Sequence, residues 1–333
     1  MQIYLDENKH FYRANLHCHS YMSDGRCSPA ELKAEYKRRG YSVVAFTDHE
    51  HVIDHSYLND EDFLAITSCE VAIKEFPRQS TMKNFDMKVA HLNFYALDPH
   101  NDVTPCYSSI ADHFVNDNCR DLIKHDGEYE RIYSTEGIND IVRTANEKGF
   151  IVSYNHPSWS LENAKDYLGY EGLFAVEIYN HSCAMKGHND DESVFDDMLR
   201  AGKRVFCTAA DDAHTKSEFD SQYIDAFGGW ISINADELSY EKIMSSLQKG
   251  DFYASSGPEI RSLVRDGDRV TIKTSPAKTI SYITRGRRRN AVIAQNGEFL
   301  TEVTFEIGEK DGYFRLKITD ECGKKAYTQA YNE

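Results

Sequence analysis

The stretch Tyr12-Arg13-Ala14-Asn15-Leu16-His17-Cys18-His19 begins the part of the sequence that decides the fold. Residues 12–16 predict a short strand that leads directly into two histidines. The segment Ser28-Pro29-Ala30-Glu31 then predicts the start of a helix, because serine caps it, proline takes the first helical position and glutamate completes a capping box. Gly40 ends this helix, and residues 42–47 predict the next strand.

The same alternation of strand and helix patterns continues to about residue 250. Further strands are predicted at residues 63–68, 88–97, 150–154, 173–179 and 204–209, and further helices at residues 138–148, 191–201 and 237–249. The polar stretch from about residue 104 to 132 predicts helices joined by loops. Strand–helix alternation indicates a parallel sheet with crossover helices, and seven strands suit a closed or nearly closed barrel.

The pattern changes at Ser255-Ser256-Gly257-Pro258. Short alternating stretches follow at residues 270–273, 280–284 and 313–319, separated by the turn pairs Asp266-Gly267, Asn296-Gly297 and Asp311-Gly312. We therefore predict an α/β barrel domain over residues 1–257, followed by a small all-β, sandwich-like domain over residues 258–333.

Composition narrows the class of substrate and the cellular compartment. The net charge of −16 argues against a nucleic-acid polymer as the substrate, because proteins that bind a phosphate backbone usually present a basic surface. None of the eight cysteines forms a C-x-x-C pair, so we expect free thiols in a reducing cytoplasm. We find no apolar run near 18 residues, and we expect no membrane association.

Histidines and carboxylates gather where the predicted strands end. His17 and His19 are two residues apart and therefore share one side of an extended chain. The remaining groups are Asp24 in Ser23-Asp24-Gly25, His49 in Thr47-Asp48-His49-Glu50, Glu70, His91, His156 in Asn155-His156-Pro157, and Asp212 and His214 in Asp211-Asp212-Ala213-His214. Because the carboxyl ends of barrel strands form one rim, we expect these side chains to meet there.

Imidazole and carboxylate ligands suit zinc, iron or manganese. The nine candidate ligands exceed the needs of one tetrahedral zinc ion, so we predict two or three divalent metal ions. Glu70 has two oxygens and could bridge two of the ions. A metal-bound water with a pKa lowered to about 7 would give a hydroxide nucleophile, while a second ion holds a phosphate oxygen.

The motifs His17-x-His19, Ser23-Asp24-Gly25, Thr47-Asp48-His49 and Asp212-x-His214 resemble those of the PHP (polymerase and histidinol phosphatase) superfamily, in the same order. The resemblance covers about residues 13 to 257 and implies a distorted (β/α)7 barrel with a trinuclear metal centre. It further implies three ligand sets, namely His17, His19, Glu70 and Asp212 for one metal, Asp24, His49 and His214 for the second, and Glu70, His91 and His156 for the third.

Several other residues have two interpretations. Asp48 and Asp211 either stabilise tight turns or orient metal-bound imidazoles. Arg26 could clamp a phosphate, and Asn180 and His181 could contact substrate at the rim, although exposed arginines and strand-end residues commonly have no such role. The remaining histidines, His10, His51, His55, His100, His113, His125 and His188, are predicted to be ordinary surface residues.

Three functional hypotheses follow from this pattern. The first is a metal-dependent phosphoesterase that hydrolyses a small phosphorylated metabolite, such as a nucleotide or sugar phosphate. The second is a metallohydrolase of carboxylic or carbamic esters, because residues 230–258 are similar to the end of PHP proteins that append a small β domain, some of which are grouped with such enzymes. The third is a metal-binding regulatory module without turnover, which the complete set of ligand residues argues against.

Overall fold

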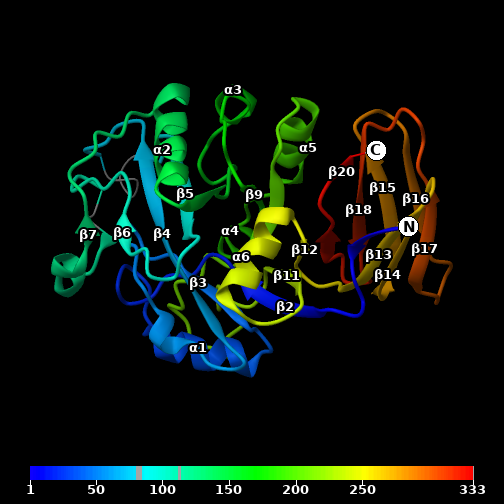
Figure 1. Ribbon diagram of the computed structural model, residues 1–333, viewed down its shortest axis with the longest axis horizontal. Coiled ribbons are helices and arrows are strands. Elements are labelled where there is room, and N and C mark those ends of the chain that lie inside the picture. Colours follow the sequence, from blue (N-terminus) through cyan, green and yellow to red (C-terminus); the bar gives the residue numbers. More distant parts are fainter. Residues whose placement is uncertain (80–84, 112–113, 333) are drawn as a thin grey trace.

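The computed structural model describes residues 1–79, 85–111 and 114–332 (Figure 1). All seven strands predicted before residue 210 are present and lie in one sheet, which confirms the strand pattern. They are β2 (His10–Asn15), β3 (Val43–Phe46), β4 (Leu64–Lys74), β5 (Val89–Ala96), β8 (Phe150–Tyr154), β9 (Ala175–Asn180) and β10 (Phe206–Ala210). Their order across the sheet is β10-β9-β8-β5-β4-β3-β2, and β11 (Trp230–Ala235) and β12 (Phe252–Ser255) continue it beyond β2.

The prediction of a wholly parallel sheet is wrong at β5. Strands β2, β3 and β4 are parallel to one another, as are β8, β9 and β10, but β5 is antiparallel to both β4 and β8. Strands β4 and β5 pair directly along seven residues, from Ser68↔Tyr95 to Lys74↔Val89, as the arms of a long hairpin. A hairpin reverses the chain without a crossover helix, so its second strand must be antiparallel.

A closed barrel is not confirmed. Between β2 and β10, an isolated bridge joins Cys18 to Ala213, where the His19 amide donates to the Ala213 carbonyl over 2.8 Å. Strand β10 itself also contacts β11 and β12, but among the described residues no strand pairing joins it to either of them. There the Gln329 amide spans the seam, since its Oε1 accepts from the Cys207 backbone and its Nε2 donates to the carbonyls of Cys207 and Phe252.

Helices cover the outside of this sheet. They are α1 (Pro29–Arg38), α2 (Thr135–Glu147), α3 (Ala164–Tyr167), α4 (His181–Met185), α5 (Glu192–Arg200) and α6 (Tyr240–Lys249). Figure 1 shows α2, α3 and α5 on one side and α1 on the other. The predicted capping box of α1 is present, because the Ser28 and Glu31 side chains each accept from the other residue's backbone amide. Helix α2, which confirms the helix predicted at residues 138–148, buries Ile138, Ile141 and Val142.

The stretch from residue 104 to 132 differs from the sequence-based expectation. Among its described residues, the prediction of helices is confirmed only for a 3-10 turn, η3 (Asp117–Leu122). A second 3-10 turn, η1 (Ser56–Leu58), lies before β4. Two short strands, β6 (Val103–Thr104) and β7 (Lys124–His125), pair with each other and fold the segment back on itself.

The C-terminal part is a sandwich of two antiparallel sheets around its own apolar core. One sheet has the order β1-β13-β14-β17, and the other continues from β12 through β19, β18, β15 and β16, with β20 paired to β18. Their bounds are β1 (Gln2–Leu5), β13 (Ile260–Asp266), β14 (Arg269–Ala277), β15 (Thr279–Thr284), β16 (Arg289–Ile293), β17 (Leu300–Glu306), β18 (Tyr313–Thr319), β19 (Lys325–Tyr327) and β20 (Tyr331–Asn332). Leu263, Ile272, Phe314 and Leu316 meet in this core.

The first residues of the chain pack with the C-terminal sandwich, although the sequence analysis assigned them to the first domain. Strand β1 pairs with β13, and Leu5 is buried in the core of the sandwich rather than in that of the first domain. The division into residues 1–257 and 258–333 itself stays a prediction. Among the described residues, no helix combines the length and the apolar character needed to span a membrane.

Candidate metal centre

The structure brings all nine candidate ligands to one end of the strands. His17 and His19 follow β2, His49 follows β3, His156 follows β8, and Asp212 and His214 follow β10. Glu70 and His91 differ from this rule, because each lies inside a strand of the long β4–β5 hairpin rather than at its end. On this hairpin Glu70 and Ala72 point to the same side of β4, and His91 pairs directly with Ala72.

Glu70 lies at the centre of the cluster. Its Oε1 is 2.9 Å from His91 Nδ1, 3.2 Å from His17 Nε2 and 3.4 Å from His156 Nε2. Its Oε2 is 3.3 Å from His49 Nδ1 and 3.4 Å from His19 Nε2. One carboxylate therefore contacts five imidazoles, and the Asn155 amide also donates to it over 2.9 Å. The two oxygens of Glu70 therefore face different sets of imidazoles.

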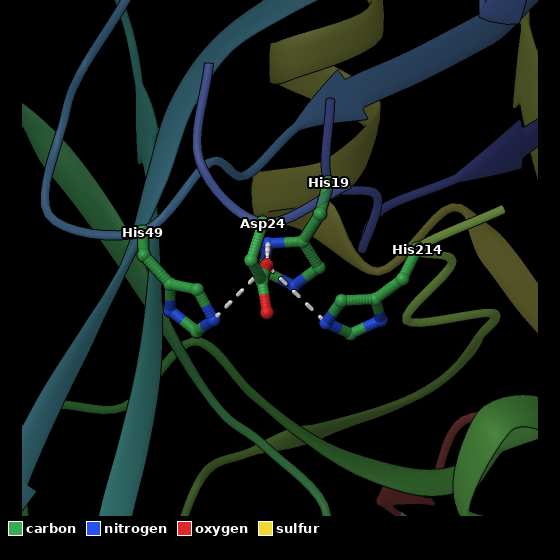
Figure 2. A group of neighbouring side chains, drawn as sticks. All are labelled: His19, Asp24, His49 and His214. Carbon is green, nitrogen blue, oxygen red and sulfur yellow. Dashed lines mark ion pairs between the residues drawn. The ribbon is translucent and has the colours of Figure 1, made fainter. Parts of the chain in front are cut away.

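A second group surrounds Asp24 (Figure 2). Asp24 Oδ1 is 3.4 Å from His214 Nε2, 3.7 Å from His49 Nε2 and 3.9 Å from His19 Nδ1. Figure 2 shows the three imidazoles pointing toward this carboxylate from three different segments of the chain. Four ligand atoms from these residues lie within 4.8 Å of one another, which would allow one ion to contact all of them.

Two further groups share His17. One consists of His17, Glu70 and His156, and the other of His17, His19 and Asp212. Asp212 Oδ1 is 3.1 Å from His19 Nε2 and 3.3 Å from His17 Nε2. These groups differ from the sets that the resemblance implied. Among the described residues, His19 joins the group of Asp24, and His91 belongs to none of the three groups although it contacts Glu70.

Three buried polar atoms of the cluster lack a hydrogen-bond partner within the described part of the chain. They are His17 Nε2, His19 Nδ1 and Asp24 Oδ1. Burying a polar atom without a partner costs about 1–3 kcal/mol, so such atoms are rare in native proteins unless an ion or water satisfies them. The residues therefore fit a bound cation, which would accept the lone pairs of both imidazoles and of the carboxylate.

The charges of the cluster also suit a cation. Burial opposes ionisation of Glu70, but the imidazoles of His91 and His17 hold the pKa of its carboxyl well below the usual range. Burial also opposes ionisation of Asp24, but the neighbouring imidazoles of His214, His49 and His19 together hold the pKa of its carboxyl below the usual range. Both carboxylates are consequently ionised at neutral pH, as metal ligands must be.

Burial acts in the opposite sense on His49. Burial, together with the charge of the neighbouring His19, lowers the pKa of this imidazole to about 3. A neutral imidazole keeps a free lone pair, so His49 is in the protonation state that binds a metal ion.

Solved structures resemble this fold at low sequence identity. A two-domain protein from Bacteroides vulgatus that contains a predicted PHP-like metal-dependent phosphoesterase is 16% identical, with 98% of this chain and 96% of that chain covered and a TM-score of 0.49. A candidate metal-dependent phosphoesterase from Bifidobacterium adolescentis is 14% identical over 61% of this chain and 88% of that chain, with a TM-score of 0.38. The structural neighbours thus include PHP-like metal-dependent phosphoesterases.

A third neighbour is an amidohydrolase from Chromobacterium violaceum with bound sulfate and no metal. It is 13% identical over 72% of this chain and 96% of that chain, with a TM-score of 0.41. No family model matches the chain, and no curated protein shows significant similarity to it.

Asp48 and Asp211 make the contacts of loop anchors. Asp48 accepts hydrogen bonds from the backbone and hydroxyl groups of Ser20 and Ser23, which fixes the loop between His19 and Asp24. Asp211 accepts from three backbone amides, at residues 227–229, and from the Tyr36 hydroxyl. Within the described chain, neither carboxylate hydrogen-bonds to an imidazole of the cluster, so these contacts favour the turn interpretation.

Glu177 is a site residue that the sequence analysis missed. Its Oε1 is 3.0 Å from His17 Nδ1, and its Oε2 accepts from the His156 amide and from Asn180 Nδ2. Glu177 lies on β9 and is 2% exposed, so the contact orients His17 from inside the protein. A charged residue in the otherwise apolar stretch 173–179 was the available signal.

We predict that Glu177→Gln weakens metal binding by about 10- to 100-fold. Carboxylates that hydrogen-bond to a metal-binding histidine fix its tautomer and raise its basicity, and losing one typically has an effect of this size. Titration of metal-free protein with Mn²⁺ or Zn²⁺, followed by calorimetry, measures the change. Glu171→Gln is the matched control, because Glu171 is exposed before β9; equal affinity for both variants would contradict the orienting role.

The three residues predicted to contact substrate, Arg26, Asn180 and His181, each contact other protein side chains. Arg26 Nη2 donates to Glu218 Oε1 over 3.0 Å at the surface. Asn180 accepts from the Cys183 amide and donates to Asp212 Oδ2 over 3.2 Å, so it positions a candidate ligand. His181 Nδ1 is 3.1 Å from the Tyr179 hydroxyl. Their role in binding substrate stays a prediction.

The prediction that the remaining histidines are surface residues is wrong for two of them. His51 and His55 are each 2% exposed, because the chain after His49 turns back under the rim and His55 packs edge-on against Phe46. His10, His100 and His125 are exposed as predicted, and His188 is partly exposed. His113 lies outside the described residues.

Proposed function

We propose that the chain is a metal-dependent hydrolase of the PHP superfamily that hydrolyses a small phosphorylated metabolite, such as a nucleotide or a sugar phosphate. The observation that carries this proposal is the convergence of nine ligand-type side chains, three of which present buried atoms without a protein partner in the described chain. Eight free cysteines support our prediction of a cytoplasmic location.

We propose two or three divalent ions, chosen from zinc, iron and manganese, at the three groups described above. Such ions supply a nucleophilic water near neutral pH and neutralise the charge that develops on a phosphoryl group. Glu70 would bridge the group of His17 and His156 to the group around Asp24, because its two oxygens face different imidazoles. Glu177 holds His17 so that Nε2 faces the cluster.

The cavity next to the cluster supports an anionic substrate. It has a volume of about 430 Å³ and is lined by His214 together with Lys186, Lys216, Tyr223 and Asp225. The Asp225 carboxylate accepts hydrogen bonds from the backbone amides of His214 and Thr215. Lys216 Nζ is 4.0 Å from Asp24 Oδ2, so its ammonium group lies directly beside the candidate ligands. Two ammonium groups suit a phosphate better than a neutral carboxylic or carbamic ester.

We expect Lys186→Gln and Lys216→Gln each to raise KM for a phosphate monoester by about tenfold or more, since a hydrogen bond to a charged group is worth about 1.5–3 kcal/mol. The bound metal content should not change, because neither lysine is a ligand. Steady-state kinetics with metal analysis of the same samples provides the measurement. Lys165→Gln on α3 is the matched control, because Lys165 is exposed and is not among the lining residues of the cavity. Unaltered KM in both test variants would refute the assignment.

A substrate screen tests the proposed function. The protein, loaded with manganese, iron or zinc, is assayed against p-nitrophenyl phosphate, a bis-phosphodiester and p-nitrophenyl acetate. We expect phosphate release that disappears with a chelator and in His17→Ala. Cleavage of the acetate alone would replace the proposal with the ester hydrolase alternative. Tight metal loading without any turnover would favour a regulatory metal-binding module.

A further inference from the structure

A second cavity lies at the opposite end of strands β8, β9 and β10 from the metal centre. It has a volume of about 770 Å³, which is within the range of about 300–1,000 Å³ typical of small-molecule sites. Its lining comes from the segments that precede or begin β8, β9 and β10, and from the sandwich around β18. Figure 1 shows the red strands β18 and β20 next to α5, and all three elements contribute residues to the lining.

The charge of this cavity is opposite to that of the chain. Lys203, Arg204 and Arg285 line it, whereas none of its described lining residues is acidic, although the chain carries a net charge of −16. Lys203 pairs with Glu171 outside the cavity. Within the described chain, the guanidinium groups of Arg204 and Arg285 have no ion pair or hydrogen bond, so both can bind an anion.

The walls between the basic groups are apolar and aromatic. Phe174 and Phe206 pack edge-on with ring centroids 5.8 Å apart, and Tyr313 of the sandwich also lines the cavity. Phe206 is only partly buried, so part of its ring borders the open volume. Such a wall can cover the organic body of a ligand whose anionic group reaches the arginines.

We propose that this cavity binds a small organic phosphate of mononucleotide size, with its phosphate between Arg204 and Arg285. The two arginines come from different parts of the fold, one directly before β10 and the other directly after β15. A ligand that contacts both therefore links the sheet of β8, β9 and β10 to the sandwich. This site is separate from the metal centre and does not depend on the proposed function.

Binding of AMP to the full-length protein in the presence of EDTA, followed by calorimetry, tests this site without turnover. We expect saturable binding of AMP that is tighter than that of inorganic phosphate. The double variant Arg204→Gln/Arg285→Gln should weaken AMP binding by about a hundredfold, since each arginine contact to a phosphate is worth about tenfold or more.

Arg287→Gln is the matched control. Arg287 belongs to the same basic turn as Arg285, is exposed and does not line the cavity, so the variant removes a nearby charge without removing the contact. AMP affinity should equal that of the wild type. The proposal is overturned if AMP does not bind, if the double variant binds it as tightly as Arg287→Gln does, or if phosphate alone binds as tightly as AMP.

Discussion

Glu70→Gln is expected to lower kcat/KM for phosphate ester hydrolysis by about a thousandfold or more and to reduce the number of bound metal ions. Glu70 contacts five imidazoles and is 1% exposed, so it is the carboxylate that joins the most candidate ligands of the cluster among the described residues. Glutamine keeps the size of the side chain but removes its charge and one ligand oxygen. Metal ions stabilise the charge of the transition state by several kcal/mol, and losing each 1.36 kcal/mol lowers the rate tenfold.

Glu75→Gln is the control for this variant. Glu75 directly follows β4 and is exposed. The activity and the metal content of the Glu75→Gln variant should therefore match those of the wild type. Metal analysis and kinetics on the same preparations are the measurements. Wild-type activity in Glu70→Gln would show that the cluster does not carry the reaction.

Asp211→Ala is expected to lower the free energy of unfolding by about 3 kcal/mol or more. The Asp211 carboxylate accepts four hydrogen bonds of 2.8 Å, from the backbone amides of Phe227, Gly228 and Gly229 and from the Tyr36 hydroxyl. Each donor that is left buried without a partner costs about 1–3 kcal/mol. Urea denaturation followed by circular dichroism gives the difference between the variant and the wild type.

Asp220→Ala is the matched substitution for this comparison. Its side chain is 88% exposed and pairs with Arg38 and Arg39 at the surface, where ion pairs contribute about 0–1 kcal/mol. We expect a change within about 0.5 kcal/mol. A similar loss for both aspartates would mean that Asp211 does not anchor residues 227–229.

Much of the fold could be predicted because strands, helices and caps depend on residues that are close together in the sequence. The capping box at Ser28 and Glu31 and the apolar face of α2 involve residues close in the chain, and both are present. The antiparallel β5 could not be predicted in this way, because strand patterns do not report direction. The pairing of β1 with β13 joins segments about 260 residues apart, and no local pattern reports it.

The candidate site was predictable to the extent that its residues stand in motifs. His17 and His19, or Asp212 and His214, share a side because they are two residues apart, and the structure brings both pairs together. Glu177 stands alone in a strand, and its contact with His17 bridges 160 residues. Likewise, the lysines beside His214 come from two loops whose approach only the fold determines.

Anomalous diffraction from crystals grown with Mn²⁺ or Zn²⁺ tests the central claim most directly. The account predicts two or three peaks, each within about 2.0–2.3 Å of its ligand atoms, with one ion held by Glu70 together with His17 and another by Asp24 together with His214. A folded protein whose side chains occupy the positions described here, but which shows no peak among them at millimolar metal concentrations, would contradict it.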